Sequence, residues 1–113
     1  MALNTKGNRI TYFGHSTFSL TTPSGQVALI DPWVTTNPWC PEELKNVQRL
    51  DAIFLTHAHT DHFGDLLALA KQHRPKIAAM FETCLWIESK ASWMRPARWE
   101  KAVRRKSGTL KLR

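Results

Sequence analysis

The sequence predicts a layered α/β fold, and three observations predict it. Segments rich in β-branched and aromatic residues open the chain between residues 9 and 30, as expected of strands. After them, short apolar runs alternate with segments whose apolar residues recur at helical spacing. With 42% hydrophobic residues in 113, the chain can build the modest core of one small domain. We therefore expect strands first, and then strand, helix, strand and helix in alternation.

The first three strands are expected to follow one another closely. Arg9 to Phe13 and Thr17 to Thr21 form the first two strands, and Gln26 to Ile30 pairs back as the third. The turn Thr22-Pro23-Ser24-Gly25 suits this hairpin, because proline presets φ and glycine takes positive φ. Asp31-Pro32 ends the third strand, since proline lacks an N–H and restricts the residue before it.

The rest of the chain is expected to alternate helices with strands. A short helix opens at proline, which suits a first turn, and two glutamates there suit the helix dipole. Leu66, Leu67, Leu69 and Ala70 form the apolar face of a longer helix and are expected in the core. The elements are expected as short helix, strand, helix, strand and helix at Pro41–Leu44, Ala52–Leu55, Gly64–Gln72, Lys76–Met80 and Glu82–Ser89.

The net charge of +7 is confined to the end of the chain. Residues 93–113 hold eight of the 16 Lys and Arg residues and one of the nine Asp and Glu residues. Residues 1–92 are therefore electrically balanced. We expect two parts, a folded domain over 1–92 and a basic tail over 93–113 that packs poorly or only locally, because it has a high charge density and lacks periodicity. Such a tail can bind RNA or an anionic lipid surface.

The composition excludes several other classes of protein. No segment approaches the roughly 18 continuous apolar residues of a membrane helix. Met1 to Asn8 is short and polar, without the pattern of a signal peptide, so a cytoplasmic location and no membrane partner are expected. Cys40 and Cys84 lack a paired metal spacing, and we interpret them as reduced, small packing residues.

The strongest chemical signal is His57-Ala58-His59-Thr60-Asp61-His62, directly after the apolar run that ends at Leu55. Imidazole and carboxylate are ligands that suit zinc, and also iron and manganese. In extended or turn-like backbone, His57 and His59 point the same way and can reach one ion. Asp61 and His62 lie further on and can face a second ion, so that two metals can activate a water. His73 and Arg74, by contrast, are expected to be solvated.

The motif H-x-H-x-D-H after a strand resembles the signature of the metallo-β-lactamase-fold hydrolases. The segment Tyr12-Phe13-Gly14-His15-Ser16-Thr17-Phe18 is similar to the opening of one branch of small metal-dependent hydrolases, and Leu29-Ile30-Asp31-Pro32-Trp33 to the family's strand that ends in Asp-Pro. The resemblance runs from about Arg9 to about Ser92. It implies the N-terminal half of an αββα sandwich, in which two sheets are covered by helices on both outer faces.

The resemblance also implies roles for individual residues. In the family, His57 and His59 would bind one metal, and Asp61 and His62 the other. Asp61 would also act in catalysis, by orienting or deprotonating the attacking water. His15 would support the site or contact the substrate. The implied cofactors are two Zn²⁺ ions, with Mn²⁺ or Fe²⁺ as alternatives.

Complete family members are about twice as long, and their second half supplies further metal ligands. The present sequence has no histidine after His73 and no aspartate after Asp65. Counted on the motif alone, each metal has two ligands, whereas zinc sites use at least three. We therefore expect a truncated chain that binds metal weakly and has little or no activity.

The tail itself is consistent with a shifted reading frame. Read from the third base of each codon, Trp93-Met94 gives GAT, for Asp, and Trp99-Glu100 gives GGA, for Gly. The result allows a G-K-G-G-like stretch, similar to a Lys-Gly-Gly-Thr-like segment of the family. A frameshifted or truncated gene product is thus our hypothesis for residues 93–113.

Three functions follow as hypotheses. The first is a metal-dependent hydrolase in which a metal-activated water attacks a small-molecule ester, lactone or phosphodiester. The second is an RNA-binding or RNA-processing protein that uses the basic tail, although the tail has no recognisable RNA-binding motif and nucleic acid is not our expected partner. The third is a non-functional fragment. Self-association is expected because half a sandwich exposes apolar surface.

Overall fold

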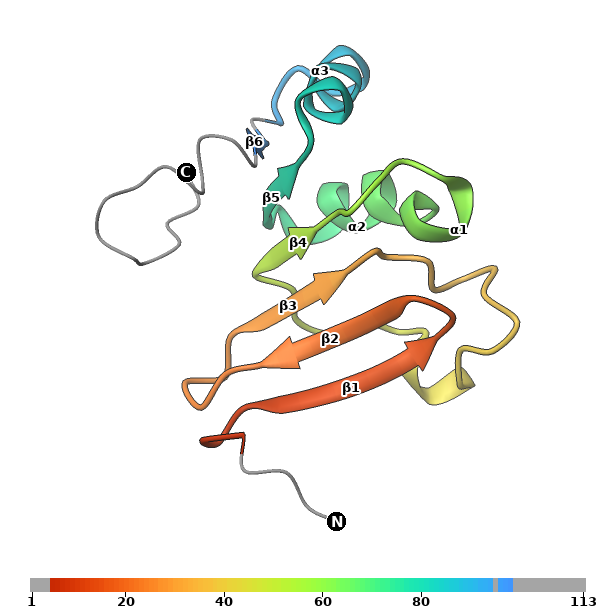
Figure 1. The fold of residues 1–113 in the computed structure, drawn as a ribbon, viewed down its shortest axis with the longest axis vertical. Helices are drawn as coiled ribbons and strands as arrows, with labels where there is room; N and C mark the ends of the chain where they lie inside the picture. The colour runs from red at the N-terminus through yellow and green to blue at the C-terminus, as the bar shows by residue number, and fades with distance from the viewer. Residues whose placement is uncertain (1–4, 95, 99–113) are drawn as a thin grey trace.

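The computed structural model describes residues 5–94 and 96–98, which form one mixed sheet with helices packed against it. The six strands follow one another across the sheet in chain order, β1-β2-β3-β4-β5-β6 (Figure 1). The strands are β1 Arg9–Gly14, β2 Thr17–Thr21, β3 Val27–Ile30, β4 Ala52–Phe54, β5 Lys76–Ala79 and β6 Ala97–Arg98. The helices are the 3₁₀ helix η1 Glu42–Leu44 and the α-helices α1 Thr60–Phe63, α2 Leu66–His73 and α3 Phe81–Lys90.

The predicted order of elements is confirmed, with two additions. The turn between β2 and β3 forms as expected, with Gly25 at φ +87° and its N–H donating to the Thr22 carbonyl at 2.9 Å. The short helix α1 was not predicted, because four residues are too few to show helical periodicity. Strand β6 was not predicted either, because its two residues are ordered only by pairing with β5.

The sheet changes from antiparallel to parallel pairing at β3, and this places the candidate site. Strands β1, β2 and β3 pair antiparallel, whereas β3, β4, β5 and β6 pair parallel. The carboxyl ends of β1, β3 and β4 therefore meet at one edge of the sheet. Ligand sites in layered α/β folds favour that edge. His15, Asp31 and the metal motif all follow these strand ends.

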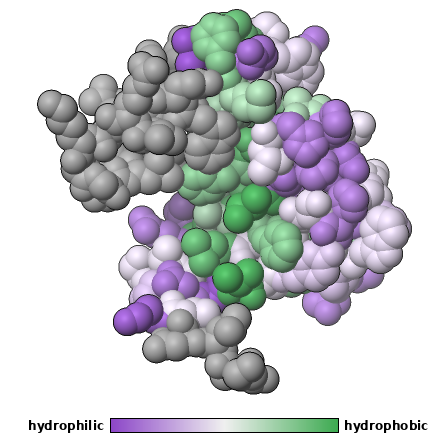
Figure 2. Space-filling model, in the orientation of Figure 1, coloured by the Kyte–Doolittle hydropathy of each residue, from purple (hydrophilic) through white to green (hydrophobic). Residues whose placement is uncertain are grey.

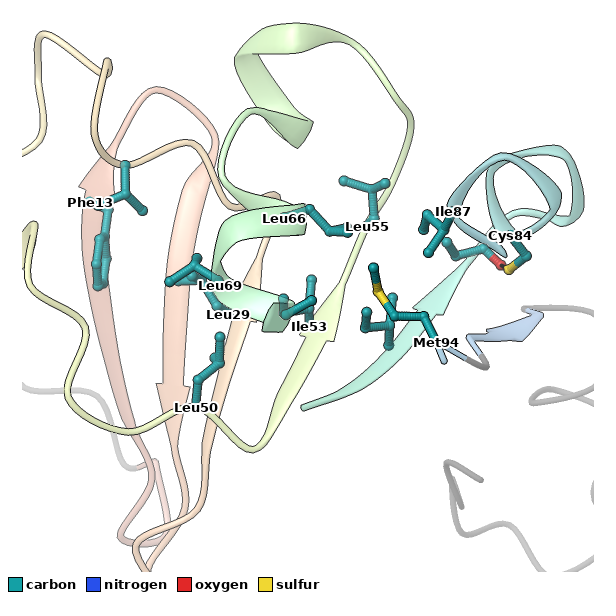
Figure 3. Close-up of a cluster of buried hydrophobic side chains, with 14 of the residues drawn as sticks. Phe13, Leu29, Leu50, Ile53, Leu55, Leu66, Leu69, Cys84, Ile87 and Met94 are labelled. Atoms are coloured by element: carbon teal, nitrogen blue, oxygen red, sulfur yellow. Dashed lines mark hydrogen bonds between the residues drawn. The ribbon is translucent and has the colours of Figure 1, made fainter. Parts of the chain in front are cut away.

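The core lies between the sheet and α2, as the apolar face of α2 predicted. Leu66 and Leu69 of α2 pack over Leu29 of β3 and Ile53 of β4 (Figure 3). All four side chains are buried, and each contributes about 1.5–3 kcal/mol relative to an exposed position. Cys40 and Cys84 are buried free thiols, which confirms their interpretation as packing residues.

The beginning of the segment predicted as a poorly packed tail is part of the fold. Met94 is only 4% exposed and belongs to the core cluster, beside Ile87 and Cys84 of α3 (Figure 3). Residues 97–98 extend the sheet as β6. The expectation of poor packing is therefore wrong for these residues, because apolar contacts with α3 and pairing with β5 outweigh the missing periodicity. Residues 99–113, with most of the basic charge, lie outside the described residues.

Within the described residues, no helix is both long and apolar enough to span a bilayer.

Candidate metal centre

His15 lies in the tight turn between β1 and β2, and its backbone is strained there. Its φ is +55°, in the left-handed region that non-glycine residues rarely adopt. The Tyr12 hydroxyl donates a hydrogen bond to the His15 carbonyl at 2.8 Å. The His15 ring lies edge-on to Trp33 at 5.4 Å and parallel to Trp39 at 6.1 Å between centroids. These contacts fix the imidazole at the sheet edge that carries the metal motif.

Gly14 makes this turn possible, and its replacement by alanine is expected to destabilise the fold. Gly14 has φ +105°, and an added Cβ would lie 2.8 Å from Trp39 Cβ and 2.9 Å from the Trp39 carbonyl carbon. Strained φ and overpacking cost about 1–3 kcal/mol each, so we expect Gly14→Ala to lower the free energy of unfolding by about 2–6 kcal/mol. Urea denaturation followed by tryptophan fluorescence measures this loss.

Gly25→Ala is the matched control for this prediction. Gly25 also has positive φ, but an added Cβ would meet only the flexible Arg49 side chain at 3.3 Å. We expect Gly25→Ala to lower the free energy of unfolding only by the cost of the strained φ, about 1–2 kcal/mol. Equal losses in the two variants would contradict the role of the close approach between Gly14 and Trp39.

The motif residues gather at the end of β4 and the start of α1. His59 is the N-cap of α1, and Asp61 and His62 lie in its single turn. The His57 ring lies 4.5 Å from the His59 ring and 4.1 Å from the His62 ring, and the His15 ring lies 5.4 Å from His62. Four imidazoles from two parts of the chain thus form one cluster.

A buried carboxylate, that of Asp31, is hydrogen-bonded to His62 of this cluster. Its side chain is 4% exposed, and its backbone has φ +50°, which aspartate tolerates better than most residues. Asp31 Oδ1 accepts the Thr56 N–H at 2.7 Å. Asp31 Oδ2 accepts the Thr56 hydroxyl at 2.6 Å and the His62 Nδ1–H at 2.8 Å. The carboxylate therefore joins the end of β3 to the metal motif that follows β4.

These hydrogen bonds determine which ring nitrogen carries the proton in His57 and in His62. His62 Nδ1 faces the Asp31 carboxylate, which only accepts, so the proton is on Nδ1 and Nε2 keeps its lone pair. The single Thr56 hydroxyl proton goes to the same carboxylate. His57 Nδ1, 2.9 Å from the Thr56 hydroxyl oxygen, must then donate to it. His57 Nε2 is left as an acceptor, the form in which imidazole binds a metal.

Asp61 connects His15 to His62 on the exposed side of the cluster. Asp61 Oδ2 lies 2.9 Å from His15 Nε2, and Asp61 Oδ1 lies 3.8 Å from His62 Nε2. Partial burial raises the pKa of the Asp61 carboxyl, but the His15 hydrogen bond and the nearby His62 outweigh it and lower the pKa overall. Asp61 is thus ionised at neutral pH, as a metal ligand must be.

Two sets of three potential ligands result, and they share His62. One set is Asp31, His57 and His62, and the other is His15, Asp61 and His62, each with ligand atoms within 4.8 Å of one another. Two ligand atoms on one tetrahedral zinc ion lie about 3.4 Å apart, so the atoms of each set would have to draw together by up to about 1.4 Å to hold an ion. His59 is in neither set, although its ring is next to that of His57. The pairing of His57 with His59 on one ion stays a prediction.

Asp65 fixes the loop that borders the site. It is 6% exposed and accepts hydrogen bonds from the Val34 N–H, the Thr35 N–H at 3.1 Å and the Thr35 hydroxyl at 2.7 Å. The Asp65 N–H in turn donates to the Pro32 carbonyl at 2.9 Å. The loop after β3, which carries Trp33, is thereby tied to the start of α2.

The structure supplies site residues that the sequence did not assign. The sequence predicts Asp31 only as the end of a strand and assigns no role in the site to Thr56 or Asp65. The available signal was the type of residue, a polar side chain directly after an apolar strand, at Asp31 and at Thr56. Their partners lie 25 to 31 residues away in sequence, so the pairing itself could not be inferred.

His73 differs from the expectation that it is solvated, whereas Arg74 is exposed as expected. His73 is half-buried, and its Nε2 has neither solvent access nor a hydrogen-bond partner among the described residues. Arg74 ends α2 in the left-handed conformation, and its guanidinium lies 3.8 Å from the centre of the Trp93 ring. The expectation was wrong for the His73 ring alone, because the packing of the described residues around α2 removes its Nε2 from solvent.

Comparison with known proteins connects this geometry to one family. Residues 11–111 match the model of the metallo-beta-lactamase superfamily. A UPF0173 metal-dependent hydrolase of Koribacter versatilis is 44% identical over 88 residues, which are 78% of this chain and 38% of the relative. A UPF0173 metal-dependent hydrolase of Rubrobacter xylanophilus is 51% identical over 83 residues, which are 74% of this chain and 34% of the relative.

A solved structure is similar as well. Igni18, a metallo hydrolase from the hyperthermophilic archaeon Ignicoccus hospitalis, superimposes with a TM-score of 0.66 at 35% sequence identity. The match covers 80% of this chain and 39% of that protein. The chain thus spans between one third and two fifths of the length of these relatives.

Proposed function

Because the chain belongs to the metallo-beta-lactamase superfamily, we propose that it is the metal-binding part of a hydrolase acting on an ester, lactone or phosphodiester. One observation carries the proposal. Asp31 accepts the Nδ1 proton of His62 directly and orients His57 through Thr56, which leaves both Nε2 lone pairs available. Histidines that bind a metal are commonly held in this way by a carboxylate.

The donor set fits a divalent metal. Nitrogen from His57 and His62 and oxygen from Asp61 are ligands that suit Zn²⁺, with Mn²⁺ and Fe²⁺ as alternatives. His15 can join them once its Nε2 gives up the proton that it donates to Asp61. A metal held there would supply Lewis acidity and lower the pKa of a bound water. We assign zinc as the first choice, because histidine outnumbers carboxylate in the cluster.

The remaining residues of the cluster orient the reactants. Asp61 is 44% exposed at its side chain, ionised at neutral pH and next to His62, so it can accept a proton from water at its carboxylate or hold that water in position. His15 is also exposed in part and lies between Trp33 and Trp39, where it can contact the substrate. The two tryptophans give the substrate an apolar surface beside the metal.

Metal affinity is expected to be low in this 113-residue chain. His62 occurs in both ligand sets, and its Nδ1 is already bonded to Asp31, so its Nε2 can serve one metal only. One ion can then have three protein ligands and a second ion fewer. Because each missing ligand removes binding energy and positioning, we expect about one weakly held zinc per chain and hydrolysis close to background.

Zinc binding is measured as metal content after dialysis and by titration calorimetry with Zn²⁺. Hydrolysis is measured with a generic phosphodiester, an ester and a lactone. His57→Ala is the variant to compare, because His57 offers one Nε2 lone pair. We expect it to weaken zinc binding further while the fold is retained. Tight stoichiometric zinc with hydrolysis that His57→Ala abolishes would contradict the expected weakness. A wild-type chain that binds no zinc at all would refute the metal site itself.

A further inference from the structure

Asn37 is a fully buried polar residue in the loop between β3 and η1, and it belongs to neither ligand set. Its side-chain amide makes three hydrogen bonds, all to backbone groups. Asn37 Nδ2 donates to the Gly14 carbonyl at 3.1 Å and to the Trp33 carbonyl at 3.0 Å. Asn37 Oδ1 accepts the Trp39 N–H at 3.0 Å. One buried side chain therefore joins the β1–β2 turn to both ends of the loop segment 33–39.

The side chain of asparagine matches these three partners. Two backbone carbonyls require two N–H donors and a backbone N–H requires an acceptor, which are the groups that one side-chain amide carries. The partners also fix which atom of the amide is nitrogen, because the reversed amide would point its oxygen at two acceptors. An aspartate in this place would have no donor, and an alanine would have neither donor nor acceptor. Loss of the Asn37 amide therefore leaves the turn and the loop without this connection.

The hydrogen bond to Gly14 constrains the backbone of His15. The peptide group that carries the Gly14 carbonyl sets the φ of His15, which is +55°. On the other side of the His15 Cα, the Tyr12 hydroxyl holds the His15 carbonyl, but that hydrogen bond is exposed. The hydrogen bond from Asn37 is buried, where water does not compete with it. Because sparsely populated backbone conformations persist only where their surroundings hold them, we assign the main constraint on His15 to Asn37.

The same amide also holds the two aromatic residues that border His15. The His15 ring lies edge-on to Trp33 and parallel to Trp39, and its Nε2 lies 2.9 Å from Asp61 Oδ2. In Figure 1 the loop after β3 passes beside the β1–β2 turn, and Figure 2 shows hydrophilic residues gathered around α1 at this edge of the sheet. The imidazole and both indole rings are thus placed beside the metal motif through hydrogen bonds to one side chain.

We propose that Asn37 is a positioning residue, which holds the imidazole of His15 at Asp61 and between the two tryptophans. It acts through the Gly14 carbonyl and contacts neither metal nor substrate. Without the Asn37 amide, the turn can relax to negative φ, and the His15 side chain then turns away from Asp61. The inference rests on the proposed function only in giving His15 a part in the site, because the placement of the imidazole is measurable without metal or substrate.

NMR spectroscopy of the metal-free 113-residue chain tests the proposal. In the wild type we expect a strong NOE between the amide proton and the Hα of His15, which is the signature of positive φ. We also expect NOEs from the His15 ring to both indole rings. In Asn37→Ala the strong NOE within His15 and the ring NOEs should be lost, while circular dichroism shows a folded chain.

Thr17→Ala is the matched control. The Thr17 side chain is also fully buried and its hydroxyl bonds to the same loop, donating to the Asp31 carbonyl at 2.7 Å and accepting the Trp33 N–H at 3.3 Å. Its replacement removes buried hydrogen bonds of the loop but not the constraint on the peptide group before His15, so the His15 NOEs should remain. A folded Asn37→Ala chain that keeps these NOEs would overturn the proposal, as would an equal loss in Thr17→Ala.

Hydrogen exchange of the wild type gives a measurement that does not require Asn37→Ala to fold. The side-chain amide protons of Asn37 should exchange at least about tenfold more slowly than those of Asn8, whose Nδ2 donates to the Thr5 carbonyl at 2.8 Å in a partly exposed position. Equal exchange rates at Asn37 and Asn8 would overturn the proposal. A wild type that binds no zinc would refute the proposed metal site and leave this inference standing, because no metal is present in these measurements.

Discussion

Replacing His62 by alanine is expected to weaken zinc binding by at least about 100-fold, the largest loss for any single side chain of the cluster. His62 belongs to both ligand sets and is 14% exposed at its side chain, so its loss breaks both sets at once. Loss of a group that only supports a ligand costs about 10–100-fold in metal affinity, and loss of a shared ligand should cost more. Titration calorimetry with Zn²⁺ at neutral pH measures the change.

His73→Ala is the control for this experiment. His73 is a histidine of the adjoining helix α2, half-buried and in neither ligand set. We expect it to leave the zinc affinity within about twofold of the wild type, far below the effect of a true ligand. Equal losses in His62→Ala and His73→Ala would show that the effect is on folding and not on the metal centre.

Asp31→Asn is expected to change both stability and metal affinity. The amide would place a donor where Oδ2 now accepts from Thr56 and His62, so one of these groups must turn away. An unpaired buried polar group costs about 1–3 kcal/mol of unfolding free energy. His62 can avoid the clash by moving its proton to Nε2, which removes the lone pair needed for zinc. We expect the zinc affinity to fall about 10–100-fold.

Asp51→Asn tests whether this effect depends on position. Asp51 accepts the Val27 N–H at 2.8 Å and pairs with Arg49, but it lies at the opposite end of β4 from the motif. Its replacement should lower stability slightly and leave zinc affinity unchanged. Calorimetry and urea denaturation of both variants separate the two effects. An Asp31→Asn chain that binds zinc like the wild type would exclude Asp31 as the residue that orients His62 and His57.

Local sequence patterns were sufficient for most of the fold. The apolar runs and turn residues predicted β1 to β5 within one or two residues, and the periodicity of Leu66, Leu69 and Ala70 predicted the core face of α2. The expected fold class is confirmed, since the sheet and its helices match part of a metallo-β-lactamase fold. Such patterns succeed where each residue's environment is set by its near neighbours.

The rest depends on contacts between distant parts of the chain. The role of Asp31 requires β3 and β4 to be neighbours, which no local pattern specifies. The burial of Met94 depends in the same way on α3, and that of His73 Nε2 on the packing around α2. Spacing within the motif predicted which motif residues share an ion. The structure adds two potential ligands from outside the motif, His15 from the β1–β2 turn and Asp31 from the end of β3.

The strand order has a consequence for how the chain folds. Each strand pairs with the strand that precedes it in sequence, so each pairing can form as soon as its second strand is available. The cost of closing a loop grows with its length, and folding is fastest where contacts are near in sequence. The sheet can therefore grow strand by strand from the β1–β2 hairpin, while the ribosome is still adding residues. In that order the strand ends that carry His15 and Asp31 would form before the motif that follows β4, and Asp31 would gain its hydrogen bonds to Thr56 and His62 only when the motif arrives.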